Sequence, residues 1–310
     1  MPSLAGQVIL ITGGTSGLGA ESAMALARRR PARIYISGRR AQAAEAVMER
    51  IQNMDPTTTE IHFLRCDLAD MASVSAAAGQ ILAAESRLDV VLANAGVAAV
   101  PAARTPDGYE VQFATNHLGH ALLVRKLLPL LRTSRGRIVT LASYGYRGAK
   151  AGIPFDSVKV EGKQGGPEKE WLVGAGIARW RRYAESKLAN VVYARELARR
   201  YPDLVSVSVA PGFVATSMVG NMGVCDRWAM WATASLYRLT TRGRGVVSAE
   251  EGAQNQVWAA AAGRNMLSNG GLYAPVGVLV PDEGLSPSAR DDKLGQKLWD
   301  WTEGEIKGYL

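Results

Sequence analysis

Short apolar runs rich in β-branched residues recur along the chain and alternate with longer stretches of helix-forming residues. The runs QVILIT and RIYIS are typical of buried strands, because each is apolar over five or six residues and flanked by turn residues. Strands are predicted at Gln7–Thr12, Arg33–Ser37, Ile61–Arg65, Leu88–Ala93, Arg137–Ala142, Val205–Val209 and Gly271–Ala274. Helices are predicted at Gly17–Arg29, Ala41–Asn53, Met71–Glu85, Gly108–Leu131, Tyr183–Arg200, Ala249–Ala262 and Ser288–Ile306, the last as an amphipathic closing helix.

The alternation of strands with helices predicts a fold of the α/β class. We expect a single-domain, Rossmann-type, doubly wound parallel sheet with helices on both faces. The domain is expected to span residues 1–310, with an irregular insertion at 146–182 and an apolar segment at 217–242. In such sheets a ligand binds beyond the carboxyl ends of the strands. The residues expected to line the site are therefore Gly13–Gly19, Gly38–Arg40, Asp67, Asn94–Gly96, Ser143 and Pro211–Thr216.

The composition excludes several other classes of protein. With 47% hydrophobic and 21% charged residues, the chain is typical of a globular protein, and no apolar run is long enough to cross a membrane. Because no leader is visible either, we expect a cytoplasmic protein. The net charge of +8 comes from short, scattered basic clusters without interleaved aromatics, which does not favour a nucleic-acid partner. Cys66 and Cys225 are expected to be free thiols, and the three histidines lack metal-ligand spacing.

Tyr183 and Lys187 form the most informative pair of chemical groups. Their spacing of four residues places both side chains on one face of a helix. A nearby ammonium group stabilises a phenolate and lowers the pKa of the phenol, so the pair is suited to acid–base chemistry near neutral pH. Alone, such a spacing is more often found on a solvated helix face.

The segment Thr12–Gly19 favours a dinucleotide. Its glycines follow the first strand and open the first helix, where the backbone can approach a pyrophosphate. The second strand lacks the acidic residue that binds a ribose 2′-hydroxyl in NAD sites and ends instead in Arg39 and Arg40. An arginine there can bind a 2′-phosphate, which predicts NADP(H) with Arg39 as the contact. Arg40 can equally be a solvated residue at the start of a helix.

Taken together in order, these motifs resemble the short-chain dehydrogenase/reductase family over Ala5 to about Gly277. They are the glycine turn, Asp67, Asn94-Ala95-Gly96, Asn116, Ser143, Tyr183-x-x-x-Lys187 and Pro211-Gly212. The segments FATNHLGH at 113–120 and YAESKLAN at 183–190 resemble the retinol dehydrogenase and protochlorophyllide reductase-like branch. The tail is similar to those of fungal secondary-metabolism reductases.

The resemblance implies a role for each matching residue. Tyr183 would exchange a proton with the substrate oxygen, Lys187 would assist it and hold the nicotinamide ribose, and Ser143 would orient the carbonyl. Asn116 would hold a water molecule that connects Lys187 to solvent. The implied cofactor contacts are Gly13, Thr15, Ser16, Gly17, Leu18, Gly19, Arg39, Asp67, Leu68, Asn94, Ala95, Gly96, Tyr183, Lys187, Pro211, Gly212, Val214 and Thr216.

Several of these residues also have local interpretations. Ser143 can cap the end of a strand, and Asn116 can bond within its own helix and kink it. Asp67 can signal the start of the helix after Leu68, and Thr216 can cap the next helix. Their joint occurrence after strand ends favours the functional interpretation.

The substrate is expected to be a bulky, largely apolar small molecule with a carbonyl or alcohol group. Residues 217–242 contain several tryptophans and methionines and are predicted to form an apolar lid, with core packing and membrane-surface contact as alternatives. The glycine-rich insertion at 146–182 is either a substrate entrance or a surface excursion. Reduction of a C=C or C=N bond, and a binding protein without turnover, remain alternative functions. Family members often dimerise through helices matching 108–131 and 183–200, so a monomer or a homodimer is expected.

Overall fold

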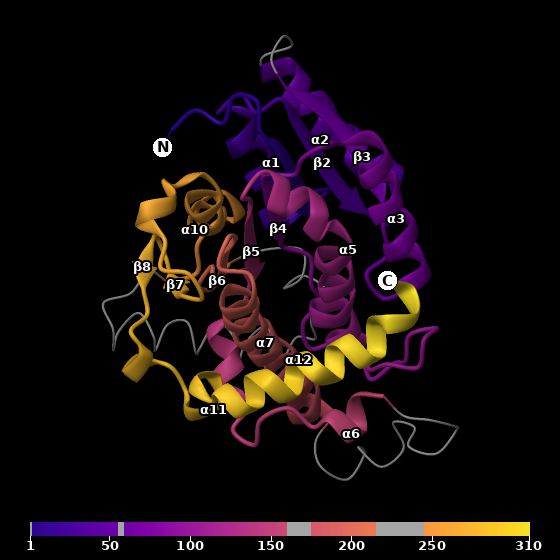
Figure 1. The fold of residues 1–310 in the computed structure, drawn as a ribbon, viewed down its shortest axis with the longest axis vertical. Coiled ribbons are helices and arrows are strands. Elements are labelled where there is room, and N and C mark those ends of the chain that lie inside the picture. Colours follow the sequence, from indigo (N-terminus) through magenta and orange to yellow (C-terminus); the bar gives the residue numbers. More distant parts are fainter. Residues whose placement is uncertain (1, 55–58, 160–174, 215–244) are drawn as a thin grey trace.

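A computed structural model describes residues 2–54, 59–159, 175–214 and 245–310. Its centre is one eight-stranded sheet with the order β3-β2-β1-β4-β5-β6-β7-β8 (Figure 1). The strands are β1 (Val8–Thr12), β2 (Arg33–Gly38), β3 (Glu60–Arg65), β4 (Val90–Ala93), β5 (Arg137–Leu141), β6 (Val205–Val209), β7 (Leu272–Ala274) and β8 (Val278–Leu279). Neighbouring strands pair in parallel except β7 and β8, which are antiparallel. The predicted doubly wound parallel sheet is confirmed, and β8 is an addition that the sequence did not reveal.

The central strands are buried on both faces, which explains their continuous apolar runs. Successive side chains alternate between two cores: Leu10 packs into one, while Ile9 and Ile11 pack into the other. The first core is covered by α3, α5, α7 and α12, and the second by α1, α2 and α10. The helices are α1 (Gly17–Ala27), α2 (Ala41–Met54), α3 (Met71–Ala84), α4 (Val111–Phe113), α5 (Gly119–Thr133), α6 (Phe155–Val158), α7 (Ala175–Arg200), α10 (Ala249–Ala261), α11 (Pro287–Arg290) and α12 (Asp292–Ile306).

Two helix predictions were wrong in ways that matter for the site. The stretch Gly108–Leu131 is not one helix: α4 leads into a π-helical segment, η1 (Ala114–Leu118), and then into α5. The N–H of Gly119 donates to the carbonyl of Ala114, five residues earlier. An α-helix bonds residues four apart, so this five-residue step defines the π-helical geometry. The helix predicted at Tyr183–Arg200 begins at Ala175, so Tyr183 lies inside α7 and not at its start.

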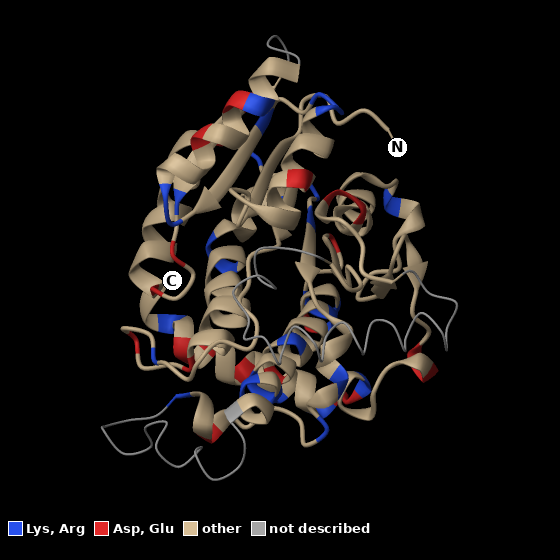
Figure 2. Ribbon diagram, turned by 180° about the vertical axis from the view of Figure 1, so that it is seen from behind, with Lys and Arg blue, Asp and Glu red and all other residues tan. Residues whose placement is uncertain are grey.

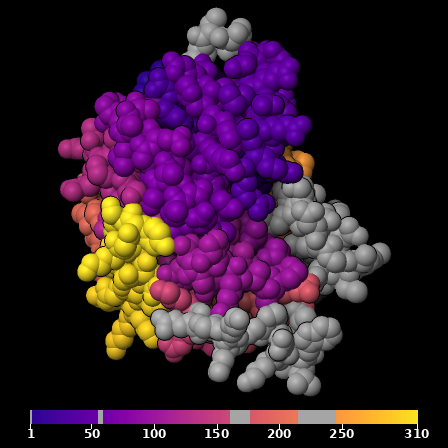
Figure 3. All heavy atoms as spheres, turned by 90° about the vertical axis from the view of Figure 1, so that its right-hand side faces the viewer, coloured from indigo at the N-terminus to yellow at the C-terminus, as the bar shows by residue number. Residues whose placement is uncertain are grey.

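The C-terminal helix lies across α7 and α5 (Figure 1). Trp299 stacks on Tyr193 of α7 with ring centroids 5.2 Å apart, and Glu303 accepts two hydrogen bonds from Arg125 of α5. In the space-filling view the yellow C-terminal segment packs closely against the earlier part of the chain (Figure 3). The predicted closing helix is confirmed, although it is divided at Asp291, whose carboxylate caps α12.

Charged residues of both signs are interspersed over the described helices and loops (Figure 2). Several basic residues from the predicted clusters are used in ion pairs, such as Arg199 and Arg200 with Glu196. Of the predicted thiols, Cys66 is buried and free, while Cys225 lies outside the described residues. No helix in the described part of the chain is long and apolar enough to cross a membrane.

Candidate active site

The turn between β1 and α1 is built for close approach of a ligand to the backbone. Gly13 and Gly17 have φ values of +64° and +52°, which favour glycine. A Cβ on Gly19 would overlap the carbonyl of Gly13 and lie 2.5 Å from Nδ2 of Asn94. Ser16, at the N-cap of α1, makes no side-chain capping bond, so the first N–H groups of the helix remain available to an anion. This geometry fits the pyrophosphate of a dinucleotide.

Buried side chains fix this turn against β4. The Oγ1 of Thr12 accepts hydrogen bonds from the backbone N–H groups of Asn94 and Ala95 at 2.9 and 3.0 Å. Asn94 donates from Nδ2 to the carbonyl of Thr12 and accepts at Oδ1 from Gln256 of α10. The predicted residue Asn94 is therefore held rigidly where the strand order reverses between β1 and β4.

The end of β2 presents exposed arginines. Gly38 permits a close approach to Thr15, because a Cβ there would lie 2.9 Å from its methyl group. Arg39 and Arg40 follow, both exposed, and within the described ranges neither forms an ion pair. The structure therefore places the predicted phosphate-binding residue Arg39 directly after β2, one position beyond the glycine that approaches Thr15.

Asp67 and Leu68 lie at the end of β3, on the side expected for adenine. The carboxylate of Asp67 accepts a hydrogen bond from the N–H of Ala69, whereas α3 is capped by Asp70. The alternative interpretation, in which Asp67 marks the start of the helix, is thus wrong, because Asp70 is the capping residue. The carbonyl of Leu68 packs so closely on Gly119 that a Cβ at position 119 would overlap its oxygen.

Ser143, Tyr183 and Lys187 come together beyond the end of β5. Ser143 caps the short helix η2 (Tyr144–Gly148) and accepts a hydrogen bond from the N–H of Gly145 at 3.1 Å. A Cβ on Gly145 would lie 3.3 Å from both the Oγ of Ser143 and the Cε1 of Tyr183, so the two side chains lie on the same side of this glycine. Lys187 is buried, and its Nζ lies 5.9 Å from the centre of the Tyr183 ring. The Nζ donates to the carbonyl of Leu141 at 2.8 Å. The spacing on α7 and the strand-end position therefore bring together the three groups that the sequence singled out.

The pKa values of the pair differ from the simple expectation. Burial raises the pKa of Tyr183 above its usual value, and the hydrogen bond from Ser143 only partly offsets this. Burial lowers the pKa of Lys187 to about 8. In the protein alone, Lys187 therefore does not produce the predicted lowering of the phenol pKa. At neutral pH Tyr183 holds its proton, and Lys187 remains mostly charged.

Asn116 lies in the π-helical segment and uses its side chain entirely on protein partners. Its Oδ1 accepts from the N–H of Val97 at 2.8 Å, and its Nδ2 donates to the carbonyl of Val97 and to Oγ of Ser186, both at 2.9 Å. Ser186 in turn donates to the carbonyl of Tyr183. The local interpretation of Asn116 is thus wrong about its partners, which lie outside its own helix, although that helix does deviate from α geometry here. Its role in holding a water molecule stays a prediction.

The segment after β6 is described as far as Val214. Gly212 has a φ of +84°, and Val214 is buried and forms a parallel bridge with Val247. Val214 also touches Gly252 of α10, where a Cβ would lie 2.5 Å from it. Thr216 and the predicted lid at 217–242 lie outside the described residues.

The insertion at 146–182 is buried where it begins and helical where it ends. Tyr146, Ile153 and Phe155 are buried in the core that α12 completes. At the other end, Trp180 of α7 meets the Tyr183 ring edge-on, with centroids 5.8 Å apart. The first part of the insertion is therefore packed into the core, residues 160–174 lie outside the described part, and its role as a substrate entrance or a surface excursion stays a prediction.

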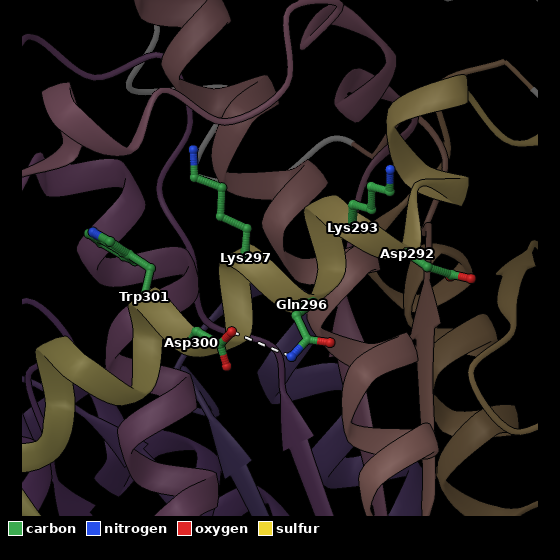
Figure 4. A pocket seen from close by; sticks show the side chains of 6 residues that line it. All are labelled: Asp292, Lys293, Gln296, Lys297, Asp300 and Trp301. Atoms are coloured by element: carbon green, nitrogen blue, oxygen red, sulfur yellow. Dashed lines mark hydrogen bonds between the residues drawn. The ribbon is translucent and has the colours of Figure 1, made fainter.

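A surface hollow of about 600 Å³ lies elsewhere, along α12 (Figure 4). Its lining residues are Asp292, Lys293, Gln296, Lys297, Asp300 and Trp301. All six belong to one helix and none belongs to the Ser143–Tyr183–Lys187 cluster. The candidate active site is therefore assigned from the grouping of Ser143, Tyr183 and Lys187, and not from this hollow.

The structure adds residues that the sequence reasoning missed. Gly145 lies flat against the Tyr183 ring, because a Cβ there would sit 3.3 Å from Cε1. Gln256 is fully buried and bonds Asn94, and Ser186 joins Asn116 to α7. Ser186 lies inside the Tyr183–Lys187 motif, and this position was the sequence feature that could have indicated its role. Gln256 lies far from the other site residues in sequence, and no sequence pattern indicated its role.

Comparisons with known proteins agree with this geometry. A family model described as short chain dehydrogenase matches residues 7–157. The short-chain dehydrogenase/reductase drtF of Aspergillus calidoustus is 33% identical, over 99% of this chain and 96% of its own length. Retinol dehydrogenase 12 of Homo sapiens is also 33% identical, over 96% of this chain and 85% of its own. A crystal structure of a putative uncharacterized protein from Mycobacterium paratuberculosis aligns with a TM-score of 0.70 and 28% identity, covering 99% and 96% of the two chains.

Proposed function

The chain belongs to the short-chain dehydrogenase/reductase family, and on that premise we propose that it reduces the carbonyl group of a bulky, largely apolar small molecule with NADPH. The convergence of Ser143, Tyr183 and Lys187 at the end of β5 carries this proposal. The reverse reaction, oxidation of the corresponding alcohol, uses the same groups.

The strand ends fit an NADP(H) molecule. The glycine turn and the uncapped N–H groups of α1 would hold the pyrophosphate, and Arg39 would bind the 2′-phosphate. Asp67 and Leu68 would lie along the adenine, and Lys187 would hold the nicotinamide ribose. When bound, the cofactor supplies the hydride.

Tyr183 and Ser143 supply the proton and the orientation. Because its pKa is raised, Tyr183 is protonated at neutral pH and can donate to an oxygen that gains negative charge. The hydroxyl of Ser143, on the same side of Gly145 as the Tyr183 ring, would add a second donor to the substrate oxygen.

Aromatic side chains support an apolar substrate. Trp180 meets the edge of Tyr183, and Tyr144 directly follows Ser143. The Trp180 ring offers a large apolar face beside the proposed acid, which suits an aromatic or polycyclic ketone or aldehyde.

A first experiment tests the reaction. NADPH oxidation is followed with a panel of aromatic and polycyclic ketones, and the product of the best compound is identified by NMR. Tyr183→Phe is expected to lower kcat by about 10²–10⁴-fold, because it removes the general acid. Tyr146→Phe, which alters a neighbouring phenol outside the cluster, is the matched control and should retain activity. Full turnover by Tyr183→Phe would contradict the proposed acid, and a reduced C=C or C=N bond in the product would replace the proposed reaction.

A second experiment tests the cofactor. A charge-assisted hydrogen bond contributes about 1.5–3 kcal/mol, so Arg39→Ala should weaken NADPH binding by roughly 10- to 150-fold and leave NADH binding unchanged. Arg40→Ala, at the adjacent exposed position, is the control. Equal affinity of the wild type for NADH and NADPH would refute the cofactor assignment.

A further inference from the structure

His120 is a buried imidazole that connects α5 with the start of the glycine turn. The residue is 5% exposed, and its Nε2 lies 2.8 Å from Oγ1 of Thr12, the last residue of β1. Its Nδ1 lies 3.1 Å from the carbonyl oxygen of Asn116 in the π-helical segment. Both ring nitrogens therefore have a polar partner, which a buried imidazole requires.

The partners of the ring decide where its proton lies. A carbonyl oxygen can only accept a hydrogen bond, so Nδ1 of His120 carries the proton that it donates to Asn116. Burial, assisted by the charge of Lys187, lowers the pKa of His120 to about 4, so the ring is neutral at neutral pH. A neutral ring has one N–H, and Nε2 is therefore the acceptor for the hydroxyl proton of Thr12.

The hydroxyl of Thr12 uses its full bonding capacity in this arrangement. Its proton points to His120, and its two lone pairs accept the backbone N–H groups of Asn94 and Ala95 at 2.9 and 3.0 Å. A second acceptor for the proton, the carbonyl of Leu92, lies farther away at 3.4 Å. If Nε2 carried the ring proton instead, three donors would share two lone pairs, and a bare Nδ1 would face a carbonyl oxygen.

These bonds lie where the strand order reverses, beside the turn that would hold the pyrophosphate. The turn and the end of β4 approach so closely that a Cβ on Gly13 would lie 3.0 Å from Cα of Ala95. One residue further on, a Cβ on Gly96 would lie 3.0 Å from Oδ1 of Asn116 and 3.5 Å from Nζ of Lys187. The imidazole therefore connects the cofactor turn with the segment that borders the catalytic cluster.

We propose that His120 is a positioning residue for the cofactor: by accepting the hydroxyl proton of Thr12, it orients the lone pairs that hold the end of β4 against the glycine turn. The inference rests on the proposed binding of NADP(H) at that turn. Without an acceptor at Nε2, the Thr12 hydroxyl would rotate towards the carbonyl of Leu92, and its lone pairs would leave the two N–H groups. The cofactor would then have to order this part of its site on binding, which lowers its affinity.

The first test is a double-mutant cycle between His120→Leu and Thr12→Val, with the dissociation constant of NADPH at pH 7.5 measured from cofactor fluorescence. Leucine fills much of the space of the imidazole without offering an acceptor, and valine keeps the shape of threonine without its hydroxyl. From the usual contribution of a neutral hydrogen bond, His120→Leu should raise the Kd by roughly 2- to 12-fold. When Thr12→Val is already present, His120→Leu should change the Kd by less than about 2-fold, because both act through one hydroxyl.

Two further variants separate this role from a loss of stability. His120→Gln is the rescuing variant, since the carbonyl oxygen of its side chain can accept the same proton, and its Kd should stay within about 2-fold of the wild type. His117→Leu is the matched control, because His117 is equally buried but has its hydrogen bond with Thr302 of α12. It should lower the stability in urea and leave the Kd unchanged.

The outcomes distinguish the inference from the proposed function. Additive effects in the cycle, an equal rise in Kd in His120→Gln, or an equal rise in His117→Leu would each overturn the inference while leaving the proposed function intact. A wild type that does not bind NADPH would refute the proposed function and the inference with it.

A second readout requires no cofactor. Selective ¹⁵N labelling of the three histidines, with His120 assigned by comparison with His120→Gln, reports the position of the proton in each ring. We expect a neutral His120 with its proton on Nδ1, and an Nε2 shift that changes in Thr12→Val and returns in Thr12→Ser. A proton on Nε2 would contradict the inference even if NADPH binds as proposed.

Discussion

The two buried histidines should make this protein sensitive to mild acid. His117 and His120 are both buried, and burial lowers their pKa values to about 3 and about 4. In the unfolded chain a histidine titrates near pH 6.5. Because the folded pKa lies below the unfolded one, the stability contribution is complete above pH 6.5 and is lost as the pH falls towards 4.

The size of the effect follows from the proton uptake of the unfolded chain. At pH 5.5 each unfolded histidine is about nine-tenths protonated while the folded one remains neutral, which costs about 1.4 kcal/mol per residue relative to pH 7.5. The pair therefore costs about 2.7 kcal/mol. Glu185 acts in the opposite direction, because burial raises its pKa to about 7 and protonation then favours the folded state. Its gain is about 1 kcal/mol over the same interval after allowance for solvent screening.

The assay is urea unfolding at pH 7.5 and 5.5, followed by tryptophan fluorescence, for the wild type and single variants. The difference between the two pH values cancels the intrinsic cost of each substitution. His117→Gln and His120→Gln should each reduce the acid loss by about 1.4 kcal/mol, and Glu185→Gln should increase it. If both histidine variants lose as much stability between the two pH values as the wild type, the reasoning from burial is refuted.

Three further predictions concern packing and assembly. Gly119→Ala should destabilise the fold by about 1–3 kcal/mol in urea unfolding, because its Cβ would overlap the carbonyl of Leu68. Gly79→Ala in α3, where the space is open, is the control and should stabilise the fold by about 1 kcal/mol in the same experiment. Equal effects of the two substitutions would show that the close contact is absent. Trp299→Ala should cost about 3–5 kcal/mol in urea unfolding, since the ring is 6% exposed and stacks on Tyr193, and a loss below 1 kcal/mol would mean that α12 does not dock as described. Because α12 covers α5 and α7, we expect sedimentation velocity to show a monomer. A dimer that is lost when residues of α5 are substituted would contradict this.

Local patterns were sufficient wherever a residue's role depends on its near neighbours. The buried strands were recognisable from their apolar runs, and β6 matches its predicted bounds because both of its ends are marked by turn residues. The glycine turn was predictable because Gly13 and Gly17 adopt backbone angles that few other residues tolerate. The π-helical segment at Ala114–Leu118 was not predictable, because no local pattern distinguishes it from an ordinary helix. It accompanies tertiary bonds from Asn116 to Val97 and Ser186.

The sequence by itself determined the fold class and the groups that carry the chemistry, because strand periodicity, glycine turns and the spacing of Tyr183 and Lys187 are local properties of the chain. Only the tertiary structure decided how these groups are held and charged. The pKa values of Tyr183 and Lys187 depend on how deeply both side chains are buried, and Lys187 is held by the carbonyl of Leu141 at the end of β5. Likewise, the contact between Thr302 and His117 joins residues 185 positions apart, and such a distance leaves no pattern in the sequence.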